Sequence, residues 1–390
     1  MSENRRVITA APENSETPLG DVQSWVTPNR LFYVRNHFDL PEIDRSAWRL
    51  AIAGCVERDL ELSWEQFESL PQRSVFATME CAGNGRSFLE RRVEGVPWGA
   101  GAIGHAEWTG VSLSLVLKQA GLKPEAVEIV GHGADQGTEK GLPEPMHFAR
   151  SLPREKALHP DTLLATRMNG ELLEPSHGAP VRLLVPGWCG VASVKWLTRL
   201  DAVDTPFQGY FQAVKYVVQR RTGRGTQTEV IGNMPVKSEI IRPRDGEAIG
   251  IGTNRIFGLA WAGEDEVAAV ELSLDGGRTW GRTELVGPRA PYSWCLWEYL
   301  WEVAAPGEYT LLSRAISSSG RIQPLRHDAL SGGYLINFSR PTHVRIDPAR
   351  RSHAFAGDTA SLVREMHQLA EERSKYRLDV ELDLTSGAGI

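Results

Sequence analysis

The chain is poor in cysteine, and its few cysteines are far apart. Its 390 residues contain four, at Cys55, Cys81, Cys189 and Cys295. No two are close enough in sequence for a C-x-x-C metal or redox site. Four such widely spaced residues do not form a disulfide framework in a chain of this length. A reducing compartment is the simpler interpretation.

Long apolar runs and a strong charge of either sign are also lacking. No apolar segment approaches the length that crosses a membrane, and residues 1–16 have no signal-peptide pattern. We therefore expect no membrane association and a cytoplasmic protein, or a periplasmic one if a leader has been removed. The net charge of −6 argues against a nucleic-acid-binding surface. A small anionic substrate would need a local cluster of arginine or lysine.

The length and a change of pattern near residue 236 predict two domains, because 390 residues exceed one ordinary core. Before this point strand-like runs alternate with short helices, which predicts an α+β domain with mixed sheets. After it, "EVAAVELSLDGGRTW" and "GEYTLLSRAISSSGRI" alternate with period two between glycine-rich turns. This pattern is typical of an immunoglobulin-like sandwich. We assign 1–20 to a flexible N-terminal arm, 21–235 to the first domain, 236–340 to the sandwich and 341–390 to a C-terminal tail with a helix.

Two helices of the first domain have clear local signals. In "LSWEQFESLP", Ser63 and Gln66 have capping-box spacing, which predicts a helix that begins after Ser63. "GVSLSLVLKQAGL" has an amphipathic pattern and a glycine, Gly121, where the helix is expected to end.

The segment "MECAGNGR", Met79–Arg86, places a cysteine where function is common. It follows "SVFATM", which is typical of a strand. Glycines let the backbone approach a bound group closely, asparagine tolerates turns, and arginine adds a permanent charge. Loops at strand ends often carry function. The alternative is a buried cysteine that packs in a turn.

Two further segments are rich in basic and hydrogen-bonding residues. "FYVRNH" joins Arg35, Asn36 and His37, and "SHGAPVRLLVPGWCGVASVKW" contains His177, Arg182 and Lys195. Alone, each histidine would more often be structural, and the basic residues would form a solvated face. Together they suit a large anionic, polar cofactor. A lone soft thiolate beside them suits one bond to a metal whose other ligands come from the cofactor.

This combination resembles the sulfite oxidase family of molybdopterin enzymes over roughly residues 25–338. The resemblance is carried by "FYVRNH", "CAGNGR", "GAGAIGHAEWTGVSL", "MNGELLEPSHGAPVRLLVPGWCGVASVKW" and the β domain that follows. It implies a molybdopterin-binding domain, an immunoglobulin-like dimerisation domain, a homodimer, and a molybdenum cofactor without haem. It also implies oxidation of sulfite to sulfate by oxygen-atom transfer. The electrons would pass to a separate acceptor, for example a cytochrome.

The resemblance also implies roles for individual residues. Cys81 falls on the position of the thiolate that binds molybdenum. On the substrate side, Arg35 and Arg86 match arginines that face the oxyanion, Tyr216 matches an active-site tyrosine, and Trp98 matches a pocket tryptophan. The positions that hold the pterin and its phosphate are matched by Tyr33, Val34, Arg35, Asn36, His37, Asp135, His177, Arg182, Ser193, Val194 and Lys195.

The chain departs from the family pattern in two places. Many relatives have two arginines after the asparagine, whereas here Gly85 precedes Arg86. Animal relatives bring a further pocket arginine on a "WNLRG"-like segment of the β domain, whereas this chain reads "RHDALSGGYLIN". The candidates for the missing charge are Arg326, His327, Arg91 and Arg92. Two other functions stay open: a molybdopterin-dependent reductase of a sulfoxide or of an oxyanion such as nitrate, and a non-enzymatic adhesion-like module.

Overall fold

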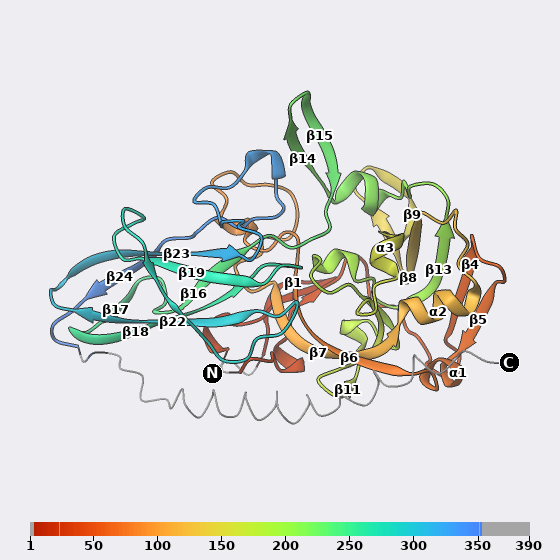
Figure 1. Ribbon diagram of the computed structural model, residues 1–390, viewed down its shortest axis with the longest axis horizontal. Helices are drawn as coiled ribbons and strands as arrows, with labels where there is room; N and C mark the ends of the chain where they lie inside the picture. The colour runs from red at the N-terminus through yellow and green to blue at the C-terminus, as the bar shows by residue number, and fades with distance from the viewer. Residues whose placement is uncertain (1–3, 23, 351, 353–390) are drawn as a thin grey trace, which may run out of the picture.

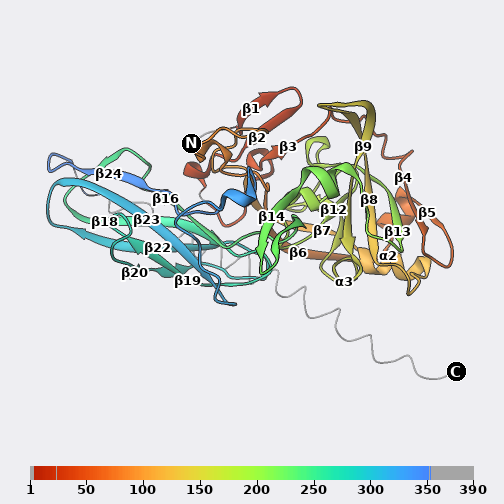
Figure 2. The ribbon, with the colours of Figure 1, turned by 90° about the horizontal axis from the view of Figure 1, so that it is seen from above.

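The structure, a computed structural model, describes residues 4–22, 24–350 and 352. A strand-rich first domain and a β-sandwich lie end to end along the longest axis (Figures 1 and 2). The helix predicted in the C-terminal tail lies outside the described residues. Both the α+β class and the sandwich architecture are as the sequence predicts.

Helices are short and few in the described part of the chain, and none of them is long and apolar enough to cross a membrane. The two with sequence signals form as predicted. Ser63 Oγ accepts a hydrogen bond from the backbone amide of Gln66, and Gln66 Oε1 accepts one from the backbone amide of Ser63. The next helix ends at Gly121, which has φ +73°. The α-helices are α1 (Trp64–Glu68), α2 (Leu113–Ala120) and α3 (Arg154–Ala157). Single turns of 3₁₀-helix are η1 (Leu19–Asp21), η2 (Asn29–Leu31), η3 (Arg86–Phe88), η4 (Pro175–His177), η5 (Gly190–Ala192) and η7 (Ala329–Ser331), and η6 (Tyr210–Lys215) is a π-helix.

The N-terminal residues form strands, so the predicted flexible arm is wrong where the structure describes it. β1 (Arg6–Ala10), β2 (Glu13–Glu16) and β3 (Val34–Arg35) form an antiparallel sheet. Asn14 is buried, and its Oδ1 accepts from the Asn36 amide at 3.0 Å. Polar residues that looked solvated in the sequence are buried here because they satisfy backbone groups of a distant segment.

Two five-stranded sheets form most of the rest of the first domain. One is antiparallel, in the order β11-β10-β7-β6 with β12 beside β10. The other has the order β5-β4-β13-β8-β9 and is parallel only between β13 and β4, as expected for a mixed sheet. The strands are β4 (Arg49–Gly54), β5 (Leu60–Ser63), β6 (Gln72–Glu80), β7 (Ile103–Ser112), β8 (Glu128–Glu139), β9 (Leu142–Pro153), β10 (Leu163–Met168), β11 (Glu171–Leu172), β12 (Arg182–Leu184) and β13 (Leu197–Val203).

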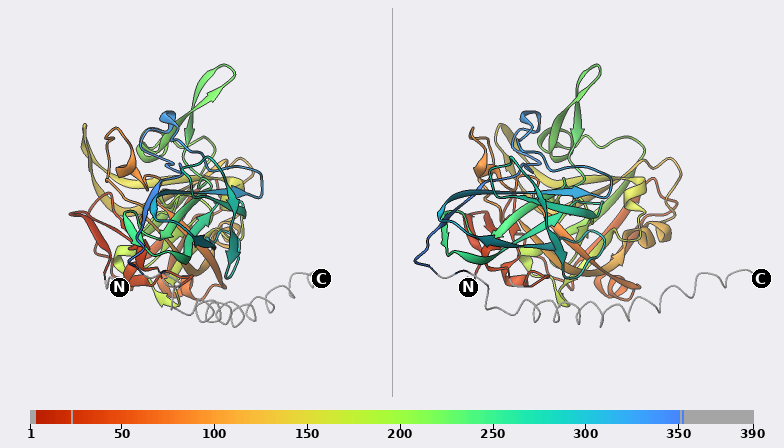
Figure 3. Two further views of the ribbon diagram at one scale, coloured as in Figure 1. Left: turned by 90° about the vertical axis from the view of Figure 1, so that its left-hand side faces the viewer. Right: turned by 60° about the vertical axis from the view of Figure 1, so that its left-hand side comes forward.

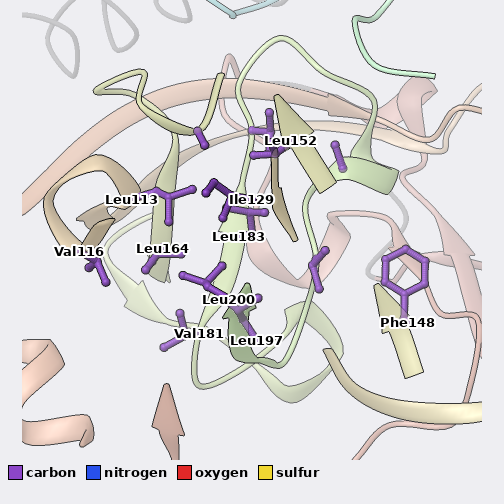
Figure 4. Packing of buried hydrophobic residues seen from close by; sticks show 14 of the residues in the cluster. Leu113, Val116, Ile129, Phe148, Leu152, Leu164, Val181, Leu183, Leu197 and Leu200 are labelled. Carbon is purple, nitrogen blue, oxygen red and sulfur yellow. The ribbon is translucent and has the colours of Figure 1, made fainter. Parts of the chain in front are cut away.

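The core of this domain forms where α2 meets the strands, as Figure 4 shows. The amphipathic face of α2 is buried there, which is what its apolar spacing predicts. A hairpin of β14 (Val217–Thr222) and β15 (Gly225–Val230) stands out from the body of the domain in Figures 1 and 3. The labelled core residues of Figure 4 are Leu113, Val116, Ile129, Phe148, Leu152, Leu164, Val181, Leu183, Leu197 and Leu200.

The second domain is a sandwich of two sheets, in the orders β16-β18-β22-β21 and β17-β24-β23-β19-β20. β24 pairs with β17 and β23, so the sandwich continues past the predicted end at residue 340. Buried and exposed residues alternate along β24, but at five residues this signal is too short to distinguish the strand from the predicted tail. The strands are β16 (Lys237–Arg242), β17 (Glu247–Ile249), β18 (Gly252–Trp261), β19 (Val267–Ser273), β20 (Gly281–Arg282), β21 (Glu284–Val286), β22 (Cys295–Val303), β23 (Gly307–Ser317) and β24 (Thr342–Ile346).

A buried ionic network joins the two domains beneath the Cys81 loop. Lys237 Nζ on β16 lies 3.1 Å from Glu80 Oε1 at the end of β6, and 3.5 Å from Glu239 Oε1. Arg340 adds a contact of 2.6 Å to Glu239, and Trp261 Nε1 donates to Glu80 Oε2 at 2.9 Å. Burial raises the pKa of Glu239, but Arg340 and Lys237 more than offset this, so the pKa lies below its usual value.

Replacing Lys237 with methionine should therefore destabilise the protein strongly. Loss of one partner of a buried ion pair leaves an uncompensated charge, which costs about 3–5 kcal/mol. Thermal or urea unfolding of the cofactor-free protein would measure it. Lys140→Met is the matched control, because the Lys140–Glu94 pair is solvent-exposed at both ends and should contribute nothing measurable. Similar unfolding of the two variants would contradict the prediction.

Candidate active site

The Cys81 loop is held in one conformation by its own asparagine. Cys81 follows β6, and its amide donates to Ala102 O at 2.9 Å. Asn84 Oδ1 accepts from the Ala102 amide at 3.0 Å, and Asn84 Nδ2 donates to Glu80 Oε1 at 2.9 Å. The Asn84 side chain therefore connects Glu80 to Ala102 across the loop, a role that the sequence did not reveal. The ionic network between the domains is connected through Glu80 to this loop.

Cys81 lines an open cavity whose walls come from several segments of the first domain. All of the predicted site residues except Arg86, Trp98 and Val194 line the same cavity. They come from β3 and the segment around it, from the loop after β6, from β8, η4 and β12, from the segment after η5, and from the position after η6. The lining residues are Phe32, Tyr33, Val34, Arg35, Asn36, His37, Met79, Cys81, Asp135, Phe148, Ser176, His177, Arg182, Gly190, Val191, Ser193, Lys195, Trp196 and Tyr216.

Several lining residues were not predicted as site residues. Phe32, Met79, Ser176 and Gly190 stand in or beside the quoted motifs, so adjacency was their only signal. Gly190 is needed for space, because a Cβ there would lie 2.5 Å from Tyr33 Oη. Phe148 comes from β9, far from any motif, and nothing local in its sequence indicated a site.

Three cationic side chains line the cavity, those of Arg35, Arg182 and Lys195. Their environment favours the binding of an anion. Arg182 is buried and donates to the carbonyls of His177 and Ser193 at 3.1 Å each. Burial lowers its pKa to about 10. Burial, then the charges of Arg182 and Arg35, hold the pKa of Lys195 well below its usual value, although Asp135 opposes this shift. An anion bound here would stabilise the charged forms of all three cations.

Both histidines of the cavity are neutral, so they add hydrogen-bonding capacity and no further charge. Burial first, and then neighbouring cations, lower the pKa of His177 to about 3 and hold the pKa of His37 well below its usual value. His37 Nε2 lies 2.7 Å from Tyr216 Oη, and its ring stacks on Phe148 with centroids 4.7 Å apart. Neutral imidazole can either donate to or accept from the tyrosine hydroxyl.

Tyr216 is positioned by the π-helix η6, which ends immediately before it. Such helices are frequent at functional sites. Arg150 is fully buried near Tyr216 and donates to the carbonyls of Phe211 at 2.6 Å and Ile231 at 2.7 Å. Its guanidinium carbon lies 6.0 Å from the Tyr216 ring centroid. These bonds fix the two segments on either side of Tyr216.

Three residues with predicted roles lie outside the cavity lining. Arg86 is held in its own loop, where Nε donates to Gly333 O at 3.1 Å and Nη1 donates to Val96 O at 2.8 Å. Gly83 leaves room for this guanidinium, because a Cβ there would lie 2.2 Å from Arg86 Nη2 and the guanidinium would have to move. Trp98 and Val194 are fully buried, Trp98 in the same apolar cluster as Cys81. Their contacts in this structure are therefore with the protein core.

Unsatisfied polar atoms test whether a cofactor fits this cavity. Asn36 Nδ2, Asp135 Oδ1 and Arg182 Nε are buried, and none has a hydrogen-bond partner among the described residues. Buried polar atoms are rarely left without a partner, so a donor, an acceptor and a cationic N–H on three residues that line one cavity indicate a polar ligand. No group of three or more His, Cys, Asp or Glu in the described part of the chain could hold a metal. A metal at Cys81 would thus need ligands from that same cofactor, and the residues fit such a group.

The pKa of Asp135 makes the cofactor-free protein sensitive to pH. Burial raises this pKa to about 6, although Lys195 opposes the shift. Because the folded protein holds the proton more tightly than the unfolded chain, Asp135 contributes stability below about pH 4, and this contribution is lost as the pH rises through about 6. The stability of the native protein relative to Asp135→Asn should thus fall by up to about 3 kcal/mol between those limits.

Unfolding of the two cofactor-free proteins between about pH 4 and pH 7 would measure this difference. Asp39→Asn is the matched control, because Asp39 is solvent-exposed. A stability difference for Asp135→Asn that does not vary with pH would contradict the assignment of a buried, proton-binding carboxyl.

Comparison with family models defines the class of this protein. A model described as "Oxidoreductase molybdopterin binding domain" matches residues 37–211. A model described as "Mo-co oxidoreductase dimerisation domain" matches residues 228–332. The protein is accordingly a molybdopterin-dependent oxidoreductase whose site domain is followed by a dimerisation domain.

Individual relatives narrow the class to a family. Sulfite oxidase of Gallus gallus is 38% identical over 340 residues, which cover 82% of this chain and 72% of that protein. NADH nitrate reductase of Ulva prolifera is 31% identical over 382 residues, which cover 89% of this chain and 44% of that protein. The crystal structure of the sulfane dehydrogenase SoxCD from Paracoccus pantotrophus matches with a TM-score of 0.77 at 30% identity, covering 87% of both chains. The chain belongs to the sulfite oxidase family, as its sequence motifs predict.

Proposed function

We propose that this chain oxidises sulfite to sulfate at a molybdenum cofactor bound through Cys81. The overall reaction converts sulfite and water to sulfate, two protons and two electrons, and a separate acceptor takes the electrons. One observation carries the proposal: the Cys81 thiol shares a single cavity with Arg35, Tyr216 and a cluster of cations. Relatives named sulfite oxidase support the choice of substrate.

The cofactor, when bound, supplies the two-electron redox chemistry that no protein side chain can perform. Arg182 and Lys195 would neutralise its phosphate, with His177 as a neutral hydrogen-bond partner. Asn36 Nδ2 and Asp135 Oδ1 offer a donor and an acceptor to the pterin ring. The cavity-lining residues that would hold the group are Tyr33, Val34, Arg35, Asn36, His37, Asp135, His177, Arg182, Ser193 and Lys195.

Arg35 and Tyr216 would bind the anionic substrate. The planar guanidinium presents several N–H donors to an oxyanion and stays charged at any pH of interest. Burial raises the pKa of Tyr216, although Arg35 opposes the shift by charge and by a hydrogen bond, so the hydroxyl keeps its proton at neutral pH. If His37 Nε2 donates to Tyr216 Oη, the phenol hydrogen is available to the substrate. The neutral state of His37 allows this arrangement.

The decisive experiment is a steady-state assay of sulfite with ferricyanide as an artificial acceptor, on protein with measured molybdenum and pterin contents. We expect about one of each per chain and sulfite-dependent turnover in proportion to molybdenum. A molybdenum-loaded sample that ignores sulfite would overturn the proposal. The same sample offered nitrate or dimethyl sulfoxide with a reduced viologen tests the reductase alternative, which the nitrate reductase relative represents.

We further propose that the sandwich domain forms a two-fold homodimer, the commonest oligomer of soluble proteins. The match of residues 228–332 to a dimerisation domain supports this. Light scattering at micromolar concentration should give twice the chain mass of 43.1 kDa. A monomer mass would count against the dimer.

A further inference from the structure

The segment of the second domain that runs from η7 (Ala329–Ser331) to Leu335 extends to the first domain and lies against the Cys81 loop. The Leu335 amide donates to Ala82 O at 2.8 Å, and Gly333 O accepts from Arg86 Nε at 3.1 Å. The segment (blue in Figure 1) lies between the sandwich and the hairpin of β14 and β15, and η7 at its start contacts β14. One backbone hydrogen bond and one hydrogen bond from the Arg86 side chain therefore hold the segment against the Cys81 loop.

This segment places the aromatic ring of Tyr334 beside the proposed substrate-binding residues. The ring centroid lies 5.1 Å from that of Tyr216, at an interplanar angle of 41°. The guanidinium carbon of Arg86 lies 5.4 Å from the same centroid, over the ring. Tyr334 is half-buried, so its side chain is confined by these neighbours.

The hydroxyl of Tyr334 is a neutral hydrogen-bond donor in this environment. Burial raises its pKa, the nearby Tyr216 and Cys81 add to the shift, and the charges of Arg86 and Arg35 oppose it without cancelling it. All four groups that act on this hydroxyl belong to the Cys81 site or to the loop that follows it. A phenol that keeps its proton can donate a hydrogen bond to an anion that the cavity-lining Arg35 binds.

None of the basic residues that the sequence offered for the missing pocket charge takes the position that Tyr334 occupies. Arg326 is exposed, and His327 Nε2 contacts Gly332 O at 2.7 Å within its own turn. Arg91 and Arg92 are exposed as well. The side chain that this stretch of the second domain brings next to the cavity-lining Tyr216 is that of Tyr334.

We propose that Tyr334 is a substrate-recognition residue, whose hydroxyl donates a hydrogen bond to the oxyanion that Arg35 and Tyr216 bind. The proposal rests on the proposed function, because it concerns the same substrate. It assigns one wall of the site to the second domain, so neither domain alone forms the complete site. A neutral donor at this wall also leaves the site with less positive charge than a further arginine would supply.

The test is Tyr334→Phe in the molybdenum-loaded protein. Phenylalanine keeps the ring and its contacts with Arg86 and Tyr216, so a purely structural role would survive the change. We expect the KM for sulfite to rise by roughly 10- to 100-fold, the range for a lost hydrogen bond to a charged group, with kcat per molybdenum much less affected. The dissociation constant of sulfate for the oxidised protein, measured by calorimetry without turnover, should rise in parallel. Tyr309→Phe is the matched control, because Tyr309 Oη donates to Ala305 O at 3.2 Å within the sandwich, away from the site.

A second variant protects the test against poor folding of the first. Tyr334→Arg adds a cation at the same wall, so sulfate should bind more tightly and with a steeper dependence on salt. Unchanged sulfate binding in either variant, or an unchanged sulfite KM in Tyr334→Phe, would overturn the proposal. A third outcome separates the two proposals. If the native protein does not oxidise sulfite, but the Tyr334→Phe variant binds sulfate less tightly than the native protein does, the sulfite assignment is wrong and Tyr334 is an oxyanion-binding residue.

Discussion

Cys81→Ser is expected to abolish sulfite oxidation while most of the pterin stays bound. Under the proposed function, Cys81 supplies the one bond between the protein and molybdenum, and serine offers a hydroxyl where the metal requires a soft thiolate. The loss should exceed the roughly 100-fold that removal of an outer partner of a metal ligand costs. The pterin should remain because many separate residues from several segments line its cavity. Turnover with sulfite and the pterin content after acid extraction would measure the two effects separately.

Cys295→Ser is the matched control for this variant. Cys295 is also buried, but in the core of the sandwich, where burial raises the pKa of its thiol to about 12 and leaves it an inert packing group. This variant should lose some stability and keep its activity. Turnover near the native value in Cys81→Ser would exclude the metal-ligand assignment and favour a packed cysteine in a turn.

Arg35→Met should raise the KM for sulfite by roughly 10- to 1000-fold. Removal of a charged hydrogen-bond partner from an anion costs on the order of 2–4 kcal/mol, and about 1.4 kcal/mol corresponds to a factor of ten. Arg35 lines the cavity together with Cys81 and Tyr216, and its charge acts on the pKa of the Tyr216 hydroxyl, so its guanidinium lies close to the proposed substrate position. Competitive inhibition by sulfate should weaken in parallel, because sulfate presents the same oxyanion to the site.

Molybdenum content decides how an effect of Arg35→Met is interpreted. Unchanged content with a raised KM assigns Arg35 to the substrate, whereas loss of molybdenum assigns it to the cofactor alone. Arg91→Met is the matched control, since Arg91 is an exposed arginine of the loop that follows Arg86. Sulfite kinetics that do not differ between the two variants would contradict the role proposed for Arg35.

The placement of Arg86 shows where sequence motifs are insufficient. The motif predicts an arginine that faces the substrate, but two of its donors bind the carbonyls of Val96 and Gly333. One of these acceptors lies 247 residues away in the chain. A motif specifies which residue follows Cys81, whereas the direction of a long side chain depends on acceptors that other segments supply.

The same reasoning applies to the elements that the sequence misjudged. Residues 6–16 have a polar composition typical of a loose arm, yet they form two strands because β3 and Asn36 provide hydrogen-bond partners. β24 is five residues long, and its membership in the sandwich depends on pairing with β17 and β23. Short strands have weak local signals, since their stability comes from neighbouring strands.

By itself the sequence determined the features that depend on neighbouring residues or on the identity of a motif. The cap at Ser63, the helix end at Gly121, the period-two strands of the sandwich and the residues of the Cys81 loop are of this kind. The tertiary structure alone decided which side chains meet: Phe148 in the cavity wall, Lys237 beneath the loop, and Tyr334 beside Tyr216. These contacts join segments that are distant along the chain. The contact of Phe148 forms by packing within the first domain, whereas those of Lys237 and Tyr334 form only when the two domains have folded against each other.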